Sequence, residues 1–296
     1  MVSELRSPGA RGHCVVIGGG LAGLSAACAL VDQGVQVTLL EKRPFLGGRA
    51  YSFTDAETGQ EVDNGQHVYL GCCTAYTGFL QQLGVFDRTT LQRRLRIPVV
   101  DRKGKVGLFS AAPFLPAPLH LIPSFLKFPH LGLRDKVRAG LAMLSIHRMD
   151  KEKHREALEG QTFRDWLKQH GQSDRSCDVL WNLITLPILN DSVSEVSAYM
   201  GIMAFQDGLL HGRNSANIGY SRVGLTELIS DAAKDYITQH GGQVLLGNAA
   251  TKLIITHSNV TGVDTGLEVL PADTVVSAVP WDVLPELLSP ELAADR

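Results

Sequence analysis

The sequence lacks any strong imbalance of charge. Its 28 Lys and Arg residues stand against 30 Asp and Glu residues, which gives a formal net charge of −2 over 296 residues. Without an excess of basic residues there is no electrostatic case for binding nucleic acid. Internal repeats and low-complexity segments are also missing. The hydrophobic content of 44% excludes a disordered chain, and the length suits two domains.

Metal-binding and disulfide patterns are absent as well. The five cysteines are an odd number, and their spacing fits neither a zinc site nor a redox Cys-x-x-Cys pair. We therefore expect no bound metal and five reduced thiols in a cytosolic protein. Residues 1–12 are polar, so we expect no secretory leader before the first apolar run.

The most informative feature present is a glycine turn, Gly18 to Gly23, which follows an apolar run at 14–17 and precedes an alanine-rich segment closed by Gly34. This order predicts a strand, a tight turn and a helix. In such a turn Gly18 ends the strand, Gly20 lets a pyrophosphate approach the backbone, and Gly23 lets the helix pack against the strand. The pyrophosphate would lie at the helix N-terminus, where free N–H groups favour an anion.

A second apolar strand, 35–40, ends at Glu41. A carboxylate there would accept hydrogen bonds from the adenosine ribose hydroxyls and would disfavour the 2′-phosphate of NADP. Gly47-Gly48-Arg49 follows. The alternative for this glycine pair is an ordinary surface turn, but a second glycine turn favours the longer FAD over NAD, and Arg49 would add a cation near the phosphates. The sequence therefore predicts an FAD site.

A dense group of polar residues follows at Asp63-Asn64-Gly65-Gln66-His67, flanked by apolar residues. Polar groups placed among buried ones need partners. Two interpretations remain open: contact with a ligand, or a hydrogen-bonded turn.

The segment from Val106 to Leu126 contains no Asp, Glu, Lys or Arg and has four prolines. The prolines exclude a regular membrane-spanning helix. We expect an apolar loop with short helical pieces that contacts a bilayer or lines an apolar channel; the alternative is that it folds into its own core. Residues 133–148 predict an amphipathic helix carrying Arg134, Lys136 and Arg138. Trp166 and Trp181 are expected in the core.

These segments together resemble the glutathione-reductase-like flavoprotein superfamily, and within it the branch of amine oxidases and phytoene desaturases. The squalene-associated FAD-dependent desaturases, understood as hydroxysqualene dehydroxylases, are the subfamily resembled most, chiefly through the motif at 63–67. The other matching segments are Pro116 to Leu121, Trp166-Leu167 with Gly171-Gln172-Ser173, Trp181 to Asn190, and Val275 to Trp281.

The resemblance implies an α/β fold, in which a Rossmann-like, glutathione-reductase-like FAD-binding domain carries an inserted, largely helical substrate domain. We place the FAD-binding domain at 12–105 and 216–284 and the substrate and membrane-contacting domain at 106–215. Family members continue past this point, so 285–296 would begin a C-terminal part that this chain lacks. A partner chain that supplies this part is one expectation.

The implied reaction is the reductive removal of the hydroxyl of hydroxysqualene, giving squalene for hopanoid synthesis. Reduced FAD would supply the hydride, His67 would serve as general acid, and Asp63 would orient His67 or bind the flavin; a structural hydrogen bond is the alternative for His67. The resemblance implies FAD contacts from Gly18, Gly20, Gly23, Glu41, Lys42, Gly48, Arg49, Asn64, Gly65, Gln66 and Ala250.

Two other functions remain open at this stage. One is an FAD-dependent polyene desaturase of the phytoene type, which would use oxidised FAD on a similar lipid. The other is a truncated, non-catalytic flavin-binding fragment. A C30 hydrocarbon substrate comes from a bilayer, so we expect a cytoplasmic protein peripherally associated with the inner face of the cell membrane through residues 109–133.

Overall fold

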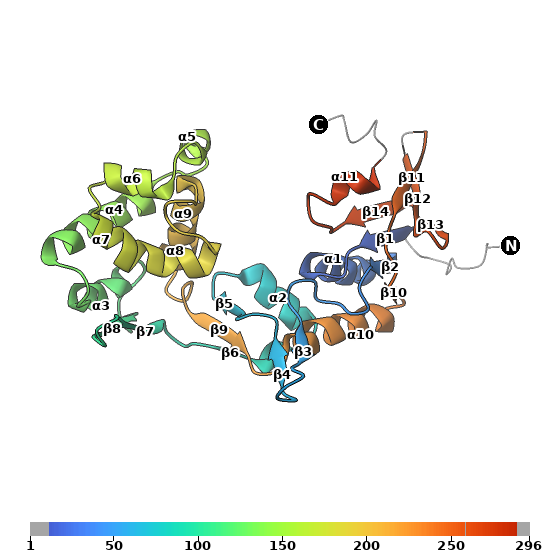
Figure 1. Cartoon of the computed structure of the whole chain (residues 1–296), viewed down its shortest axis with the longest axis horizontal. Coiled ribbons are helices and arrows are strands. Elements are labelled where there is room, and N and C mark those ends of the chain that lie inside the picture. The colour runs from blue at the N-terminus through green and yellow to red at the C-terminus, as the bar shows by residue number, and fades with distance from the viewer. Residues whose placement is uncertain (1–11, 258, 289–296) are drawn as a thin grey trace. The chain divides into compact units, whose positions relative to one another are not determined.

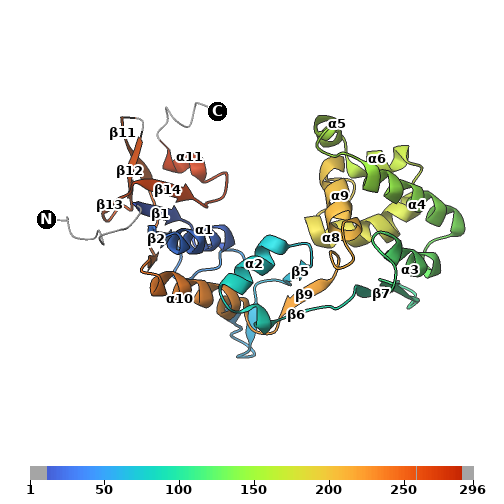
Figure 2. The same ribbon diagram turned by 180° about the vertical axis from the view of Figure 1, so that it is seen from behind.

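The computed structural model describes residues 12–257 and 259–288, which form two compact units (Figure 1, Figure 2). Of the described residues, the first unit holds 12–67, 75–90 and 221–288, and the second holds 68–74 and 91–220. Residues 68–74, 91–105 and 216–220, expected in the FAD-binding domain, therefore belong to the second unit. The expectations for a leader and for most of 285–296 fall outside the described residues.

The first unit is built on a parallel sheet of four strands. Its order is β10 (Gln243–Leu246), β2 (Gln36–Glu41), β1 (His13–Ile17) and β14 (Thr274–Ser277). Strands β1 and β2 are almost wholly buried because both faces of the sheet are covered. Helices α1 (Leu21–Asp32) and α10 (Ala232–Gln239) pack side by side against it (Figure 1). The predicted strand, turn, helix and strand are confirmed.

Smaller elements complete the first unit. A three-stranded antiparallel sheet contains β11 (Lys252–Thr256), β12 (Asn259–Asp264) and β13 (Val269–Pro271), and β3 (Ser52–Thr54) forms a hairpin with β4 (Glu61–Asp63). The remaining elements are α2 (Thr74–Gln82), the short helical turn Phe86–Arg88, the π-helical turn η5 (Thr226–Asp231) and α11 (Leu284–Leu287). Strand β13 is only three residues long.

The second unit is mainly helical. Its helices are α3 (Ile122–Lys127), α4 (Leu133–Arg148), α5 (Arg155–Glu159), α6 (Phe163–Gln169), α7 (Asp174–Ser176), α8 (Asn182–Leu189) and α9 (Ala198–Phe205). Helical turns occur at Leu119–Leu121, Cys177–Trp181 and Gln206–Leu210. Two small sheets accompany them: β7 (Arg96–Val100) with β8 (Val106–Ser110), and β5 (Val68–Leu70), β9 (Ile218–Ser221) and β6 (Thr89–Leu91) in the order β5-β9-β6.

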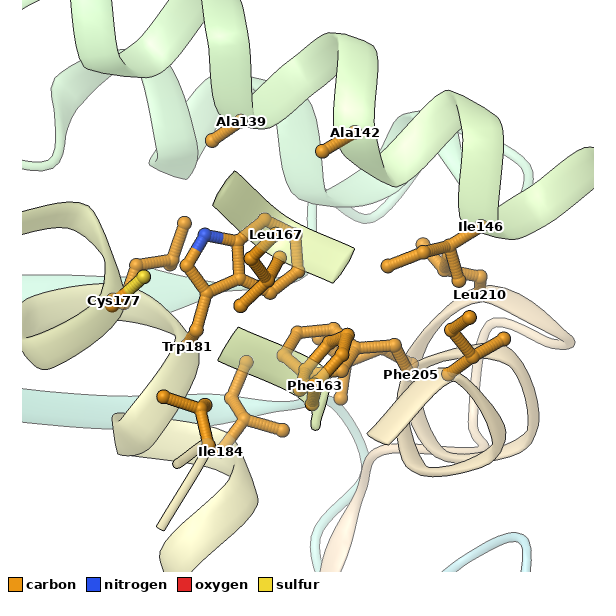
Figure 3. Close-up of a cluster of buried hydrophobic side chains, with 14 of the residues drawn as sticks. Ala139, Ala142, Ile146, Phe163, Leu167, Cys177, Trp181, Ile184, Phe205 and Leu210 are labelled. Atoms are coloured by element: carbon orange, nitrogen blue, oxygen red, sulfur yellow. The ribbon is translucent and has the colours of Figure 1, made fainter. Parts of the chain in front are cut away.

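The core of the second unit is an aromatic cluster, in which Phe163 contacts the rings of Trp166, Trp181 and Phe205 (Figure 3). The indole Nε1 of Trp181 donates to Gln172 Oε1 at 3.0 Å, so this fully buried polar atom is satisfied. The prediction that Trp166 and Trp181 are core residues is confirmed.

The proline-rich apolar segment is divided between core and surface. Its start is the strand β8, not a loop, and short helical pieces follow, as expected. Leu121 and Phe125 are buried in the core of the second unit, whereas Phe114 is 92% exposed. The alternative, that the segment folds into a core, thus holds for part of it, and contact with a bilayer or an apolar channel stays a prediction. Among the described residues, no helix combines the length and the apolar character needed to cross a membrane.

Candidate functional site

The predicted dinucleotide site lies at the carboxyl edge of the parallel sheet. Gly18 follows β1, Glu41 ends β2, and Ala278 follows β14. Gly18 N donates to Leu40 O at 2.8 Å, and Ala278 N donates to Ile17 O at 2.8 Å, so the three strand ends are held together. Ligands of open α/β sheets bind at this edge, where the strand order changes direction on either side of β1.

Two glycines of the first turn are required by the protein itself. Gly18 has φ +108°, and a Cβ atom placed on it would lie 2.9 Å from Ala278 O. A Cβ atom on Gly23 would lie only 1.8 Å from Gly18 O. Gly23 therefore allows the close packing of helix on strand that the sequence predicted.

Gly20 is different, because the protein leaves the space beside it open. It has an ordinary extended conformation, with φ −79° and ψ 179°. The nearest atom to a Cβ placed there, apart from those of its chain neighbours, would be Gly48 Cα at 3.9 Å. No contact within the described residues thus demands glycine here. Gly20 also caps α1 without a side-chain hydrogen bond, so the N–H groups of the first helical turn remain available to an anion.

The second glycine turn lies against the first. Gly47 N donates to Gly19 O at 2.8 Å, and Gly20 and Gly47 form a parallel bridge. Gly48 has φ +61°, and a Cβ atom on it would lie 3.1 Å from Gly20 Cα. The two turns therefore lie against each other with Gly20 and Gly48 half-buried, an arrangement that suits an extended dinucleotide and not merely a surface turn.

Glu41 holds the first turn as well as facing the expected ribose position. Its buried carboxylate accepts hydrogen bonds from two backbone groups, Gly19 N at 2.7 Å and Arg43 N at 2.8 Å. Each oxygen keeps a second lone pair, so the expected ribose hydroxyls can still donate to it. The sequence predicted the ligand-facing role but not the structural one.

The cations near this edge are exposed. Sequence analysis named Lys42 and Arg49. The cation that contacts the two glycine turns at 18–23 and 47–48, together called the cradle below, is Arg43, whose Nη1 donates to Gly48 O at 3.2 Å. The sequence feature that could have identified Arg43 as a site residue is its position two residues after Glu41. Ala250 is half-buried in a loop whose Asn248 N donates to Glu41 O at 3.0 Å, which keeps it beside the end of β2.

The polar motif at 63–67 is separated by the fold into two environments. Residues 64–67 are exposed, so the expectation that these polar groups lie among buried residues was wrong. His67 Nε2 lies 3.3 Å from Asn64 Oδ1. Asp63 Oδ1 instead accepts from Ser52 Oγ at 2.7 Å and from Leu225 N at 3.1 Å, so this carboxylate ties the β3–β4 hairpin to the start of η5.

Ser230 is a site residue that sequence analysis missed. Its Oγ is buried, has no hydrogen-bond partner among the described residues, and would lie 2.9 Å from a Cβ atom on Gly47. The open space at Gly20, the free helix N-terminus and this unpartnered hydroxyl at the second turn together fit a dinucleotide cofactor. Within residues 12–257 and 259–288 no cluster of His, Cys, Asp and Glu could hold a metal ion.

Comparison with known proteins agrees with this geometry. The model of the family described as flavin containing amine oxidoreductase matches residues 21–296. A probable zeta-carotene desaturase of Synechococcus elongatus is 28% identical over 272 residues, covering 88% of this chain and 55% of the relative. A 15-cis-phytoene desaturase of Glycine max is 26% identical over 281 residues, covering 93% of this chain and 49% of the relative. The chain thus spans about half the length of these curated relatives.

Solved structures share the fold. An oxidoreductase from Methanosarcina mazei superposes with a TM-score of 0.66 at 20% identity, covering 90% of this chain and 58% of that one. Cyclohexylamine oxidase from Brevibacterium oxydans superposes with a TM-score of 0.64 at 21% identity, covering 96% and 62%. These similarities support the α/β architecture and carry no information on substrate.

Proposed function

The chain belongs to the flavin-containing amine oxidoreductase family, and from this premise we propose that it is an FAD-dependent oxidoreductase of the carotene-desaturase type, acting on a long polyisoprenoid lipid. The observation that carries the cofactor assignment is Gly20, which is a glycine although no neighbouring protein atom requires it. A ligand that approaches the backbone at this position would explain why the residue is glycine.

The residues of the cradle have distinct tasks in this proposal. The N–H groups at the start of α1 bind the pyrophosphate, and the carboxylate of Glu41 binds the ribose while it holds Gly19 in place. The backbone of Gly48 lines the dinucleotide, and Arg43 holds this backbone in place by donating a hydrogen bond to the carbonyl oxygen of Gly48. Bound FAD would supply hydride chemistry, which no side chain can supply.

The substrate class rests on the relatives. Carotene and phytoene desaturases match across most of this chain, whereas the solved amine oxidases are similar at a level that shows fold alone. The comparisons therefore favour oxidative desaturation of a polyene over the dehydroxylation that the sequence motif first implied.

Reductive dehydroxylation of hydroxysqualene is the second candidate, and the motif at 63–67 favours it. His67 is exposed at the end of this motif, and its Nε2 lies 3.3 Å from Asn64 Oδ1. In this reaction a hydride adds to the carbon that loses its hydroxyl, and a proton joins the hydroxyl, which leaves as water. His67 is the proposed proton donor. Asp63 would stabilise the β3–β4 hairpin and would not orient the imidazole.

The cofactor assignment is tested first, by titrating the purified chain with FAD and recording flavin absorbance and binding heat. We expect one FAD per chain. Gly20→Val should abolish binding without unfolding the protein, because the new side chain occupies the space of the pyrophosphate. Gly78→Val is the matched control, since Gly78 lies on a helix of the same unit with nothing within 4 Å of its Cβ position. Equal FAD affinity in both variants would refute the cradle.

The reaction is tested next with the FAD-loaded protein. Phytoene or zeta-carotene with oxidised FAD and a quinone acceptor tests desaturation, and hydroxysqualene with reduced FAD under anaerobic conditions tests dehydroxylation. Squalene formation that is lost in His67→Ala with FAD still bound would select the second candidate. A loaded protein that converts none of these lipids would refute both and support a non-catalytic flavin-binding fragment.

A further inference from the structure

Helix α4 has two apolar faces, although only one is needed for the core. On the inner face, Ala139, Ala142 and Ile146 are fully buried. Figure 3 shows these three pointing from α4 toward the aromatic cluster around Trp181. The inner face therefore satisfies the hydrophobic requirement of a helix packed on a domain core.

The outer face carries a second set of apolar side chains. Leu133 is 77% exposed, Val137 57%, Leu141 60% and Leu144 41%. Their spacing of four, four and three residues places them in one stripe along the sixteen-residue helix. Single exposed leucines are ordinary, but a continuous stripe along four helical turns marks an interaction surface.

The apolar exposure continues into the preceding segment. Leu126, at the end of α3, is exposed, and its carbonyl oxygen accepts a hydrogen bond from Lys136 Nζ of α4 at 2.6 Å. The end of α3 and the first turns of α4 are thus joined. Further exposed apolar side chains precede them at Phe114, Leu115, Leu119 and Ile122.

Most charged side chains of this segment are basic. Residues 106–149 contain five basic side chains, Lys127, Arg134, Lys136, Arg138 and Arg148, and one acid, Asp135. That acid is engaged, because its Oδ1 accepts a hydrogen bond from Ser173 Oγ at 2.9 Å. The surface combines exposed apolar side chains with a local excess of positive charge in a chain whose net charge is −2.

We propose that the outer face of α4, with the exposed apolar side chains of 114–126, docks on an anionic lipid bilayer, the helix lying in the plane of the interface. Leucine and valine would enter the boundary between headgroups and acyl chains, while the arginines and lysines meet lipid phosphates. A second copy of this chain is a poorer occupant, because a symmetric contact would bring like charges such as Arg134 together.

This surface differs from the one expected from the sequence alone. The composition pointed to residues 109–133, of which Leu121, Phe125 and Phe128 are buried. The contact proposed from the structure is centred on α4, and from the sequence-based range it keeps only the exposed side chains of 114–126 and Leu133. It does not depend on the proposed function, since lipid binding requires neither FAD nor turnover.

The test is vesicle flotation of the full chain, using phosphatidylcholine vesicles with and without phosphatidylglycerol. We expect flotation with the anionic vesicles and weaker flotation with the neutral ones. The variant Leu133→Gln/Val137→Gln/Leu141→Gln should lower the partition coefficient at least ~10-fold, because three apolar side chains no longer enter the lipid. Glutamine keeps helix propensity, and circular dichroism melting confirms the fold.

The control variant is Leu267→Gln/Val269→Gln, which removes two exposed apolar side chains of the first unit. It should float like the parent chain. Absence of flotation in the parent, or equal flotation of the α4 variant, would overturn the proposal. A dimer in light scattering that becomes monomeric in the α4 variant would assign the face to a second copy and would also overturn it. Because flotation is measured without FAD or substrate, loss of the proposed function would leave this result intact.

Discussion

A Cβ atom on Gly23 would lie 1.8 Å from the carbonyl oxygen of Gly18. Helix α1 therefore packs closely against strand β1, which precedes it in the sequence. Two glycines separated by five positions fix the geometry of the whole edge, while Gly20 between them leaves room for a ligand. Fold and cofactor binding are therefore assigned to different glycines of the same turn.

The first prediction separates these two assignments. Gly23→Ala should lower the free energy of unfolding of the cofactor-free protein by at least ~2 kcal/mol, because the methyl group forces α1 away from β1. Gly20→Ala should change it by less than about 1 kcal/mol, since its methyl group meets only Gly48 Cα. Urea unfolding followed by circular dichroism measures both. Equal destabilisation would mean that Gly20 is also required for packing.

The second prediction concerns Glu41. In Glu41→Gln one side-chain oxygen becomes an NH₂ group, so either Gly19 N or Arg43 N faces a donor in place of an acceptor. We expect a loss of about 1–3 kcal/mol in unfolding free energy without FAD, together with weaker FAD binding. The exposed Glu57→Gln is the control and should match the parent in both measurements. Weaker FAD binding at unchanged stability would show that the hydrogen bonds to the turn contribute nothing.

The third prediction is a pH dependence of stability. Burial, reinforced by the Arg213 cation, lowers the pKa of His120 below its usual value of 6.5. Neither of its buried ring nitrogens has a hydrogen-bond partner among the described residues. Below pH 6.5 the unfolded chain therefore binds a proton that the folded chain rejects, so stability should fall as the pH decreases from there toward the folded pKa, and should not change from this cause above it.

His120→Leu should remove this part of the slope. The measurement is the midpoint of urea unfolding between about pH 5 and 8, with the exposed His147→Gln as control. Identical slopes for the parent and His120→Leu would show that His120 titrates normally in the folded protein.

The fourth prediction concerns the polar network beneath the aromatic cluster. Gln172 Oε1 accepts hydrogen bonds from Trp181 Nε1 and from Ser176 Oγ. Trp181→Phe removes one donor and leaves a cavity, so we expect a loss of about 2–3 kcal/mol in unfolding free energy. The double variant Trp181→Phe/Gln172→Leu should lose less than the sum of the two single losses, because each single variant already breaks the Trp181–Gln172 hydrogen bond. An additive loss in the double variant would contradict the network.

Local signals in the sequence were enough for the cofactor-binding unit. The period of the apolar residues and the positions of Gly18, Gly23 and Gly34 determined β1, α1 and β2, because each of these elements is specified by neighbours within a few residues. The helix predicted at 133–148 has those bounds in the structure for the same reason. The family resemblance identified FAD before any tertiary contact was known.

Tertiary structure decided what depends on distant partners. Strand β5 pairs with β9, about 150 residues later, which moves 68–74 out of the expected domain. Asp63 contacts Leu225 instead of His67, and Gly48 reaches Gly20, because chain segments far apart in sequence meet there. The periodicity of α4 predicted an amphipathic helix, but a helix with apolar residues on two sides does not reveal which side the core covers. Packing settled that question, since it buries the side of α4 that carries Ala139, Ala142 and Ile146 against the aromatic cluster.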